Sequence, residues 1–462
     1  METSIIDKLK EICGEDWVVS DLSMIGGYLY DETEINLKPE ACKDVVVVKP
    51  SNTKEISEVV KLANRERTPI IPRGGGTGLN GAVIPDRPGI ILSMERLSNS
   101  IDVDEKNLMV SVDSGVTLAQ LNDELKNTKG LFFPIHPGDE GAQIGGMVAE
   151  NAGGVSAVKH GIMRNHVKGL EVVLPTGEIV NLGGKLIKNN AGFDLLHMII
   201  GSEGTLGIIT KANLKLYPKE QFTGTLIVSF DNNEDASDVV PKILQSGVNP
   251  LAIEFVERTV IQKAAEHMGL VWPAKEGSVD LMIILEESTE DDLFNNSEKI
   301  IEIAEEHNVV DSIIAETEKD QRNILVIRSN VYTAYKEDAV DAMDISVPPG
   351  NVPDFVRDLA VIAKKYNTVL PSVGHIGDGN IHNFVLRENG EIPSWFEDIR
   401  LDIYKAAMNY GGSITAEHGT GRTRKKYMHL QYTQRELEIM KGVKRAYDPN
   451  GILNPGNVVD LD

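Results

Sequence analysis

Between residues 45 and 220, short runs of β-branched residues alternate with stretches whose apolar residues recur at the spacing of a helix. The runs VVVVKP, TPIIP and LMVSVDSG predict strands at 45–50, 68–72 and 108–115. Helices are expected to follow the first and third of these strands, over the segments TKEISEVVKLANRER and TLAQLNDELKNT, and Thr117 is a suitable N-cap for the second helix. This alternation is typical of an α/β arrangement.

The pattern changes after Pro218, where glycine becomes rarer. Strands are predicted over GTLIVSF and LMIILEE, long acidic helices over ASDVVPKILQSG and SEKIIEIAEEHN, and a final helix at the start of QRELEIMKGVKRAYDPNGILNPG. We therefore expect an α+β protein in three parts: a helical lead-in at 1–40, a glycine-rich domain at 41–219, and a second α+β domain at 220–462 that ends in a helical segment.

The chain of 462 residues carries a net charge of −24, from 70 acidic and 46 basic residues. Such a surface repels nucleic acid and anionic lipid, and an anionic cofactor would have to be held by local dipoles and a few cations. The two cysteines, Cys13 and Cys42, are too few for an iron–sulfur cluster, which usually takes four thiolates. No stretch resembles the apolar core of a signal peptide or a membrane span, so we expect a cytoplasmic protein.

The stretch PRGGGTGLNGAVIP, at 72–85, contains a G-x-G-x-x-G motif at 76–81. A Rossmann dinucleotide site requires a helix directly after this motif, but Pro85 and Pro88 exclude a helix here. Two interpretations stay open for the loop. It is either a sharp structural turn or a nest of backbone N–H groups for a pyrophosphate, with Arg73 as the accompanying cation.

Two further glycine blocks follow, HPGDEGAQIGGMVAENAGGVSAVKHG at 136–161 and GSEGTLGIIT at 201–210. In order and spacing, the three blocks resemble the FAD-binding domain of the vanillyl-alcohol-oxidase type. The second half is similar to the D-lactate and glycolate dehydrogenases and to D-2-hydroxyglutarate dehydrogenase. The resemblance implies a two-subdomain FAD-binding domain of PCMH type at 41–219 and an FAD-linked-oxidase C-terminal domain, for substrate and metal, at 220–462.

The resemblance also implies which residues bind FAD. Those for the pyrophosphate are Arg73, Gly74, Gly75, Gly76, Thr77 and Gly78, and those along the rest of the cofactor are Pro137, Gly138, Gly145, Gly146, Asn151, Gly154, Gly161, Ile209 and Asn454. Some relatives attach FAD covalently through a histidine after the three glycines. Because this chain has Thr77 at that position, we expect non-covalent FAD.

The segment SVGHIGDGNIHNFV, at 372–385, predicts a hairpin, because Asp378 and Gly379 form a strong two-residue turn signal. That turn would place His375 opposite His382, with their Cβ atoms about 5 Å apart. Two imidazoles at this distance suit one metal ion. Two structural histidines on a sheet surface are the alternative.

The segment TAEHGTGRTRKKY, at 415–427, adds Glu417 and His418. A carboxylate completes a His-His-carboxylate ligand set with open positions for substrate, and a free histidine serves as a general base. A solvated Glu–His pair before a helix is the alternative. By the family resemblance, the GH-x-GDGN-x-H and EHG-x-G motifs imply His375, His382 and Glu417 as ligands of one divalent metal (Zn, Fe or Mn) and His418 as the base.

Two positions bear on the substrate. Arg328, in a helical pattern, matches the family arginine that binds the substrate carboxylate, a task suited to a guanidinium; a surface ion pair with Glu337 is the alternative. Dicarboxylate-specific relatives carry a lysine where this chain has Ala342. The D-2-hydroxyglutarate dehydrogenases carry an asparagine where this chain has Phe384. The asparagine of this chain, Asn383, lies one residue earlier, which leaves any role for it in doubt. The absence of the lysine at Ala342 favours a small monocarboxylate.

The resemblance therefore implies an FAD- and metal-dependent dehydrogenase that oxidises D-lactate, or next glycolate, to the 2-oxo acid by hydride transfer to the flavin. A D-2-hydroxyglutarate dehydrogenase, a flavin electron-relay subunit without its own substrate and a metal-dependent hydrolase are the alternatives. The electrons are expected to reach a partner protein, an electron-transferring flavoprotein or an iron–sulfur subunit, and a quinone or oxygen stays open as acceptor. A homodimer is also left open.

Overall fold

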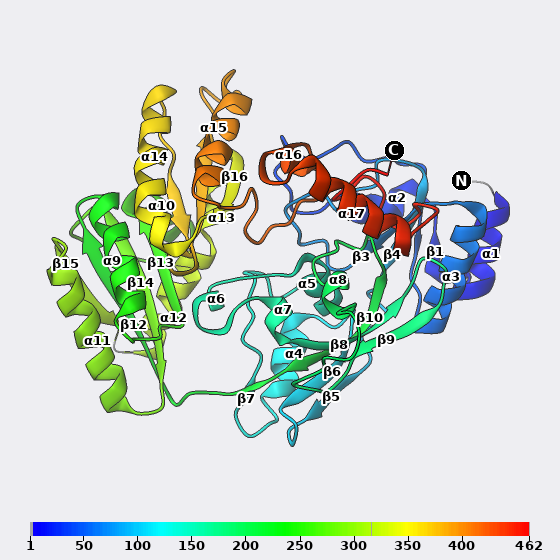
Figure 1. The fold of residues 1–462 in the computed structure, drawn as a ribbon, viewed down its shortest axis with the longest axis horizontal. Helices are drawn as coiled ribbons and strands as arrows, with labels where there is room; N and C mark the ends of the chain where they lie inside the picture. The colour runs from blue at the N-terminus through cyan, green and yellow to red at the C-terminus, as the bar shows by residue number, and fades with distance from the viewer. Residues whose placement is uncertain (1–2, 316, 462) are drawn as a thin grey trace.

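The structure is a computed structural model that describes residues 3–315 and 317–461, and these form three large sheets and a two-stranded ribbon (Figure 1). The first sheet has the order β1-β2-β4-β3, with bounds Val18–Val19, Val45–Val48, Gly89–Ser93 and Ile70–Arg73. Its last three strands are parallel, and β1 is antiparallel to β2. Helices α1 (Thr3–Cys13) and α3 (Thr53–Glu66) pack on it, so the N-terminal segment is part of this layer.

The second sheet is antiparallel throughout, with the order β5-β6-β10-β8-β9. Its strands are Ile101–Asp104, Met109–Asp113, Ile208–Lys215, Val167–Val173 and Ile179–Gly183. Helices α4 (Leu118–Leu125) and α5 (Ile144–Glu150) share its apolar core, and Thr117 caps α4 in a capping box with Gln120, as predicted. Only the first sheet is therefore an α/β arrangement, and the chain as a whole is α+β, as expected.

The remaining sheet has seven antiparallel strands in the order β15-β12-β14-β13-β17-β18-β16. The chain enters it after the ribbon formed by β7 (Leu131–Phe132) and β11 (Tyr217–Pro218). Its strands, in this order, are Asp311–Ala315, Phe222–Phe230, Val279–Glu287, Ala252–Glu257, Ser372–Gly374, Asn380–Leu386 and Ala339–Ser346. The strands predicted over GTLIVSF and LMIILEE lie within β12 and β14.

Helices cover both faces of this sheet. On one face lie α9 (Asn233–Gln245), α11 (Glu290–Glu305), α14 (Val352–Lys365) and α15 (Phe396–Asn409). The other face holds α10 (Arg258–His267), α12 (Glu318–Ser329) and α13 (Val331–Tyr335). Because successive side chains of a strand point to opposite faces, Val228 packs against the first group of helices and Ile227 against the second group.

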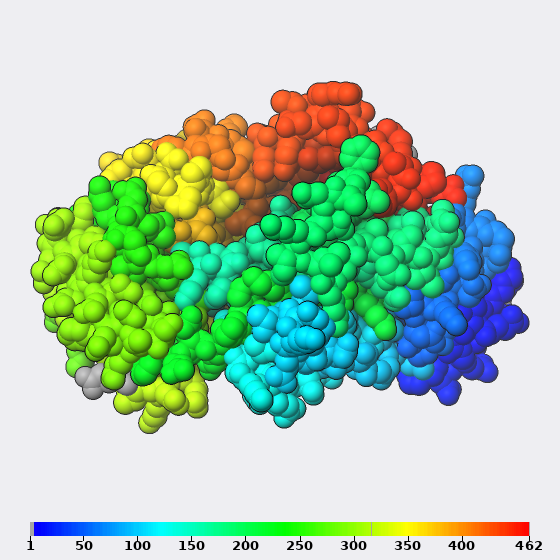
Figure 2. All heavy atoms as spheres, turned by 60° about the horizontal axis from the view of Figure 1, so that its bottom comes forward, coloured from blue at the N-terminus to red at the C-terminus, as the bar shows by residue number. Residues whose placement is uncertain are grey.

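The C-terminal segment returns from the third sheet to the first. After α16 (Met428–Gln431) and α17 (Gln434–Tyr447), Ile70 N–H donates to Ile452 O at 2.8 Å and Asn454 N–H donates to Ile70 O at 2.7 Å. In Figure 2 the orange and red C-terminal atoms lie over both halves of the molecule. The remaining helices are single turns: α2 (Leu22–Ile25), α6 (Ala157–His160), α7 (Met163–His166) and α8 (Leu196–Ile199). Within the described ranges, each helix is too short or too polar to span a bilayer.

A buried ion pair fixes one end of the third sheet. Asp280 on β14 is fully buried and accepts hydrogen bonds from Arg258 Nε at 3.0 Å and Nη2 at 2.6 Å. Ser229 Oγ at 2.6 Å and Trp272 Nε1 at 2.8 Å also donate to this carboxylate. A buried charge of this kind is tolerated because its oxygens are satisfied by donors.

We therefore expect Asp280→Ala to destabilise the protein strongly, because it leaves the Arg258 guanidinium buried without its counter-charge. The expected loss is about 3–5 kcal/mol, measured as a lower urea midpoint for unfolding. Asp123→Ala is the control: it breaks an ion pair with Lys126 whose side chains are 73% and 75% exposed, and should cost under about 1 kcal/mol. Equal shifts for the two variants would contradict the prediction.

Candidate active site

The glycine loop leaves β3 at Arg73 and does not form a helix, since residues 82–88 consist of a turn followed by bends. The exclusion of a Rossmann site is thus confirmed. A Cβ on Gly75 would lie 3.0 Å from Gly141 O, and one on Gly76, at φ +75°, would collide with the Arg73 guanidinium. The buried Arg73 donates from Nη2 to Gly27 O at 3.0 Å, while its Nη1 has no hydrogen-bond partner.

Three adjoining cavities run from this loop to the third sheet. The first lies between the loop, α5 and Glu417–His418, the second continues to α12 and α13, and the third extends behind the loop to Ile209 and Asn454. They adjoin because they share lining residues: Thr77, Glu417 and His418 line the first and second, and Gly74, Gly146 and Glu150 line the first and third. The result is one extended space.

Thirteen of the fifteen residues expected to bind FAD line these cavities. The two that do not are Asn151 and Gly161. Asn151 is the left-handed C-cap of α5, and its Oδ1 accepts a hydrogen bond from Arg164 N–H at 2.9 Å, so its side chain is used within the fold. Gly161 is the C-cap of α6, with φ +81°. The thirteen are Arg73, Gly74, Gly75, Gly76, Thr77, Gly78, Pro137, Gly138, Gly145, Gly146, Gly154, Ile209 and Asn454.

The cavity walls fit a long, polar ligand such as FAD. Several buried polar atoms of lining residues have no hydrogen-bond partner, and in the first and third cavities they include Arg73 Nη1, Gln143 Oε1 and Asn454 Oδ1. Because native structures rarely leave such atoms unpaired, they indicate a group that pairs with them. At Gly138 and Gly146 a Cβ would meet no atom within 4 Å, so the backbone is open toward the cavities there.

The hairpin at 372–385 forms, but the predicted two-residue turn is wrong. Strands β17 and β18 pair Val373 with His382, and a 3₁₀ turn over Ile376–Asp378 precedes Gly379. His375 O accepts from both Asp378 N–H at 3.1 Å and Asn380 N–H at 3.2 Å, which closes a longer loop. His375 therefore lies just beyond the end of β17 and not opposite His382, yet the two rings remain close, with centroids 5.7 Å apart.

The two histidines and Glu417 converge on one point. His375 Nε2 lies 3.5 Å and His382 Nε2 lies 3.4 Å from the same oxygen, Glu417 Oε1. Burial opposes the charged form of His375, but the carboxylates of Glu254 and Glu417 outweigh burial and hold its pKa well above the usual range. Two imidazole nitrogens and a carboxylate, all nearly buried, are a ligand set that can hold a divalent cation with further positions open.

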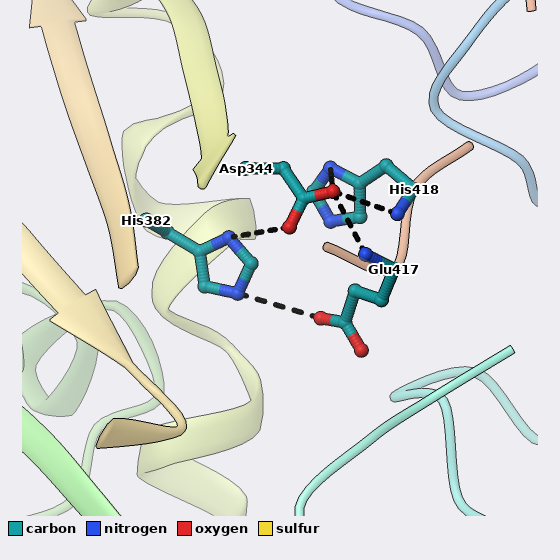
Figure 3. Close-up of side chains that lie close together, drawn as sticks. All are labelled: Asp344, His382, Glu417 and His418. Carbon is teal, nitrogen blue, oxygen red and sulfur yellow. Dashed lines mark hydrogen bonds and ion pairs between the residues drawn. The ribbon is translucent and has the colours of Figure 1, made fainter. Parts of the chain in front are cut away.

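Asp344, on β16, lies beside this group but has no free oxygen (Figure 3). Its Oδ2 accepts from the N–H groups of Ala416, Glu417 and His418 at 2.9, 3.0 and 2.8 Å, and from Thr415 Oγ1 at 2.8 Å. Its Oδ1 accepts from Asn380 Nδ2 at 3.0 Å. Although one atom each from Asp344, His382, Glu417 and His418 lie within 4.8 Å of one another, these bonds make Asp344 the anchor of the 415–418 turn.

His418 stacks on His382, with ring centroids 5.2 Å apart and planes at 13°. Burial lowers the pKa of His418, and the nearby carboxylate of Asp344 raises it. The effect of burial is larger, so the pKa falls to about 4. Its Nδ1 has no hydrogen-bond partner. The imidazole is therefore neutral at pH 7 and can accept a proton, and it lines the first and second cavities at their junction.

Arg328 lies in the second cavity, which measures about 480 Å³ and also reaches His375, His382 and Ala342. Its partner is the buried Glu254, with Nη2 at 2.6 Å from Oε2, and not Glu337. The other oxygen of Glu254 lies 2.6 Å from His375 Nδ1. The arginine that was expected to bind a carboxylate thus shares one cavity with the candidate metal ligands and His418.

Sequence reasoning missed Glu254 entirely and assigned no role to Asp344. Both are acidic residues in mostly apolar strands, AIEFVE and AVDAMDIS, each of which carries one further acid. A buried carboxylate in such a strand needs donors from elsewhere. That signal was available, but it did not reveal which residues, about 70–120 positions later, would supply the donors.

Comparison with known proteins identifies the family to which the chain belongs. Residues 45–183 match the model of an FAD binding domain, and residues 219–458 match the C-terminal domain of FAD linked oxidases. A D-lactate dehydrogenase of Archaeoglobus fulgidus is 39% identical, covering 99% of both chains. A D-lactate dehydrogenase of Anaerostipes hadrus is 34% identical, covering 98% of this chain and 97% of its own.

Among solved structures, p-cresol methylhydroxylase with bound substrate superposes with a TM-score of 0.78 over 99% of this chain and 97% of its own. The identity is 17%, so this likeness concerns the fold alone.

We expect Asp344→Ala to loosen the 415–418 turn, because three partly buried N–H groups lose their acceptor, at up to about 1–3 kcal/mol each. Hydrogen exchange measured by mass spectrometry should show faster exchange in the peptide that contains this turn, about tenfold for each 1.4 kcal/mol lost. Asp344→Asn should be milder, since an amide oxygen still accepts. Unchanged protection in Asp344→Ala would show that the turn is held by other contacts.

Proposed function

The chain belongs to the family of FAD-linked oxidases, and on that premise we propose that it oxidises a small D-2-hydroxy acid, D-lactate first and glycolate second, to the 2-oxo acid with FAD as the electron acceptor. One observation carries the proposal: Glu417 and His418 line both the first cavity, between the glycine loop and α5, and the second cavity, which contains Arg328. Cofactor and substrate would therefore meet at the proton acceptor.

In this proposal residues 41–219 hold FAD and residues 220–462 hold the substrate and a metal. Arg73 and the backbone of the glycine loop bind the pyrophosphate, and Thr77 leaves the cofactor non-covalent. The remaining cavity-lining residues accommodate the flavin and the adenosine. When bound, the flavin supplies the acceptor for a hydride from C2 of the substrate.

His375, His382 and Glu417 would hold the divalent ion, with zinc, iron and manganese all compatible with two imidazoles and a carboxylate. A bound ion supplies a Lewis acid for the substrate hydroxyl. Two side chains of the protein provide proton transfer and substrate binding. His418, neutral at pH 7, takes the hydroxyl proton, and Arg328 binds the carboxylate and so orients the substrate in the cavity.

The cavity favours a monocarboxylate. Ala342 and Phe384 form its wall where dicarboxylate-specific relatives carry a lysine and an asparagine, and neither can bind a second carboxylate. Lys336 also lines this cavity, but it is paired with Glu32 at 2.7 Å, and both side chains are 52% exposed. A volume of about 480 Å³ leaves room for a longer substrate, so D-2-hydroxyglutarate is the second candidate.

The reduced flavin has to pass its electrons onward. The chain offers two thiols, Cys13 and Cys42, and an iron–sulfur cluster usually takes four. We propose a protein acceptor, an electron-transferring flavoprotein or an iron–sulfur subunit. A relay subunit without its own substrate would not need His375, His382, Glu417, His418 and Arg328 gathered in one cavity.

The test is anaerobic bleaching of the flavin by a panel of 2-hydroxy acids. Loss of the flavin absorbance near 450 nm should be fastest with D-lactate, slower with glycolate, and slowest with D-2-hydroxyglutarate and L-lactate. Prior treatment with a chelator should suppress bleaching. A protein whose flavin is bleached by none of these acids, with or without added metal, would refute the proposal, and preferential bleaching by D-2-hydroxyglutarate would favour the second candidate.

We expect His418→Ala to lower kcat for D-lactate by about 10²–10⁴-fold, the usual contribution of a general base, while FAD and metal contents stay at the wild-type level. His429→Ala is the control, since His429 is exposed and its Nδ1 contacts only Lys426 O, at 2.8 Å. Activity of His418→Ala at half the wild-type rate would mean that another group takes the proton.

A further inference from the structure

Glu254 connects the two functional parts of the site. It lies on β13, at the centre of the third sheet, and is fully buried. Its Oε1 lies 2.6 Å from His375 Nδ1 and its Oε2 lies 2.6 Å from Arg328 Nη2. We propose that Glu254 is a positioning residue that couples the metal site to the substrate-binding arginine, one carboxylate oxygen serving each. This inference rests on the proposed function of the site.

The register of the sheet explains why Glu254 reaches His375. Strands β13 and β17 are antiparallel and pair Phe255 with Gly374 and Val256 with Val373. Continued by one residue, this register sets Glu254 opposite His375, just beyond the last paired residue of β17. The contact is therefore built into the centre of the sheet and does not depend on a flexible loop.

The contact decides which nitrogen of His375 is available. Hydrogen-bonded to a carboxylate, Nδ1 keeps its proton, so Nε2, which lies 3.5 Å from Glu417 Oε1, is the nitrogen that would give up its proton to a metal ion. A carboxylate behind a histidine in this way orients the ring and strengthens the histidine as a metal ligand, and its loss typically costs 10–100-fold in metal affinity.

The second oxygen holds Arg328. A long arginine side chain can adopt many rotamers, and a buried partner removes much of that freedom before substrate arrives. This contact is an ion pair and not a hydrogen bond, since Nη2 and Oε2 both lack a hydrogen-bond partner, as does Nε, and the guanidinium retains other N–H donors. With Nη2 fixed on Glu254, these donors stay in the cavity that also contains His375 and His418.

Only a carboxylate satisfies both partners, because both are donors. A glutamine of the same size offers one oxygen and one NH₂ group, so in either orientation one donor faces another donor. An alanine offers no acceptor. This chemistry predicts that the metal site and the arginine fail together when Glu254 is removed, and that at least one of them fails when it becomes an amide.

The experiment uses purified FAD-loaded protein stripped of metal, with Mn²⁺ and Zn²⁺ each titrated alone against a competing chelator, and D-lactate kinetics measured separately. We expect Glu254→Ala to weaken metal binding about 10–100-fold and to raise KM for D-lactate about tenfold or more. Glu254→Gln should show at least one of these changes. Glu257→Gln, on the same strand, is the matched control: its amide oxygen keeps the hydrogen bond from Asn233 Nδ2, 2.8 Å in the wild type, and neither value should change.

A Glu254→Gln variant with wild-type metal affinity and wild-type KM would overturn the inference, as would a Glu254→Ala variant that changes only one of the two. If Glu254→Ala does not retain FAD, the glutamine variant alone decides. Coupling also predicts non-additivity: Arg328→Met should raise KM strongly in the wild type and little on the Glu254→Ala background. Metal binding by the wild type needs no turnover, so a wild type that binds no metal would instead count against the proposed function.

Discussion

Ten residues, Thr415 to Arg424, are held by buried acceptors on both sides, and the site between the two halves of the chain depends on them. On the side of the third sheet, Asp344 accepts from three consecutive N–H groups of this segment. On the other side, the Glu203 carboxylate accepts from Thr420 N–H at 2.7 Å and Gly421 N–H at 2.8 Å. Because hydrogen bonds to an ionised acceptor such as Asp344 are strong and backbone donors rarely stay unpaired, this segment has little freedom to move. Glu417 and His418 are thereby fixed between the glycine loop and the sheet.

Buried acidic residues also affect the electrostatics of the first cavity. The chain is strongly acidic, yet the cavity proposed for a diphosphate contains carboxyl groups, among them Asp31 and Glu150. Burial is the largest cause that raises the pKa of Asp31, and burial also raises the pKa of Glu150 well above its usual range. The nearby Glu203 adds to the shift of Glu150. Burial raises the pKa of Glu203 itself to about 7. Burial thus opposes the charged form of these carboxyl groups beside the cavity, and Arg73 adds a buried cation.

The seven-stranded sheet acts as the platform for the chemistry. Four of its neighbouring strands provide the site: β13 carries Glu254, β16 carries Asp344, β18 carries His382, and β17 ends directly before His375. Successive side chains of a strand point to opposite faces of the sheet. Glu254 therefore faces the second cavity, while Phe255, the next residue, packs in the apolar core on the other face. A rigid sheet with buried carboxylates behind two histidines holds the ligands in place before any ion binds.

The sequence by itself determined the local features. Periodicity located the strands and helices, Thr117 was recognised as a cap, the two prolines after the glycine loop excluded a Rossmann helix, and the motifs identified His375, His382, Glu417 and His418 as neighbours. Tertiary structure decided what depends on distant pairing. The Asp378–Gly379 signal predicted a tight turn, but the turn formed differently, and Gly379 packs so closely on Val347 O that a side chain there would collide with it. The roles of Glu254 and Asp344 arise from contacts with residues about 70–120 positions away, and local propensity carries no information about such contacts, because strand register is set only when the whole sheet packs.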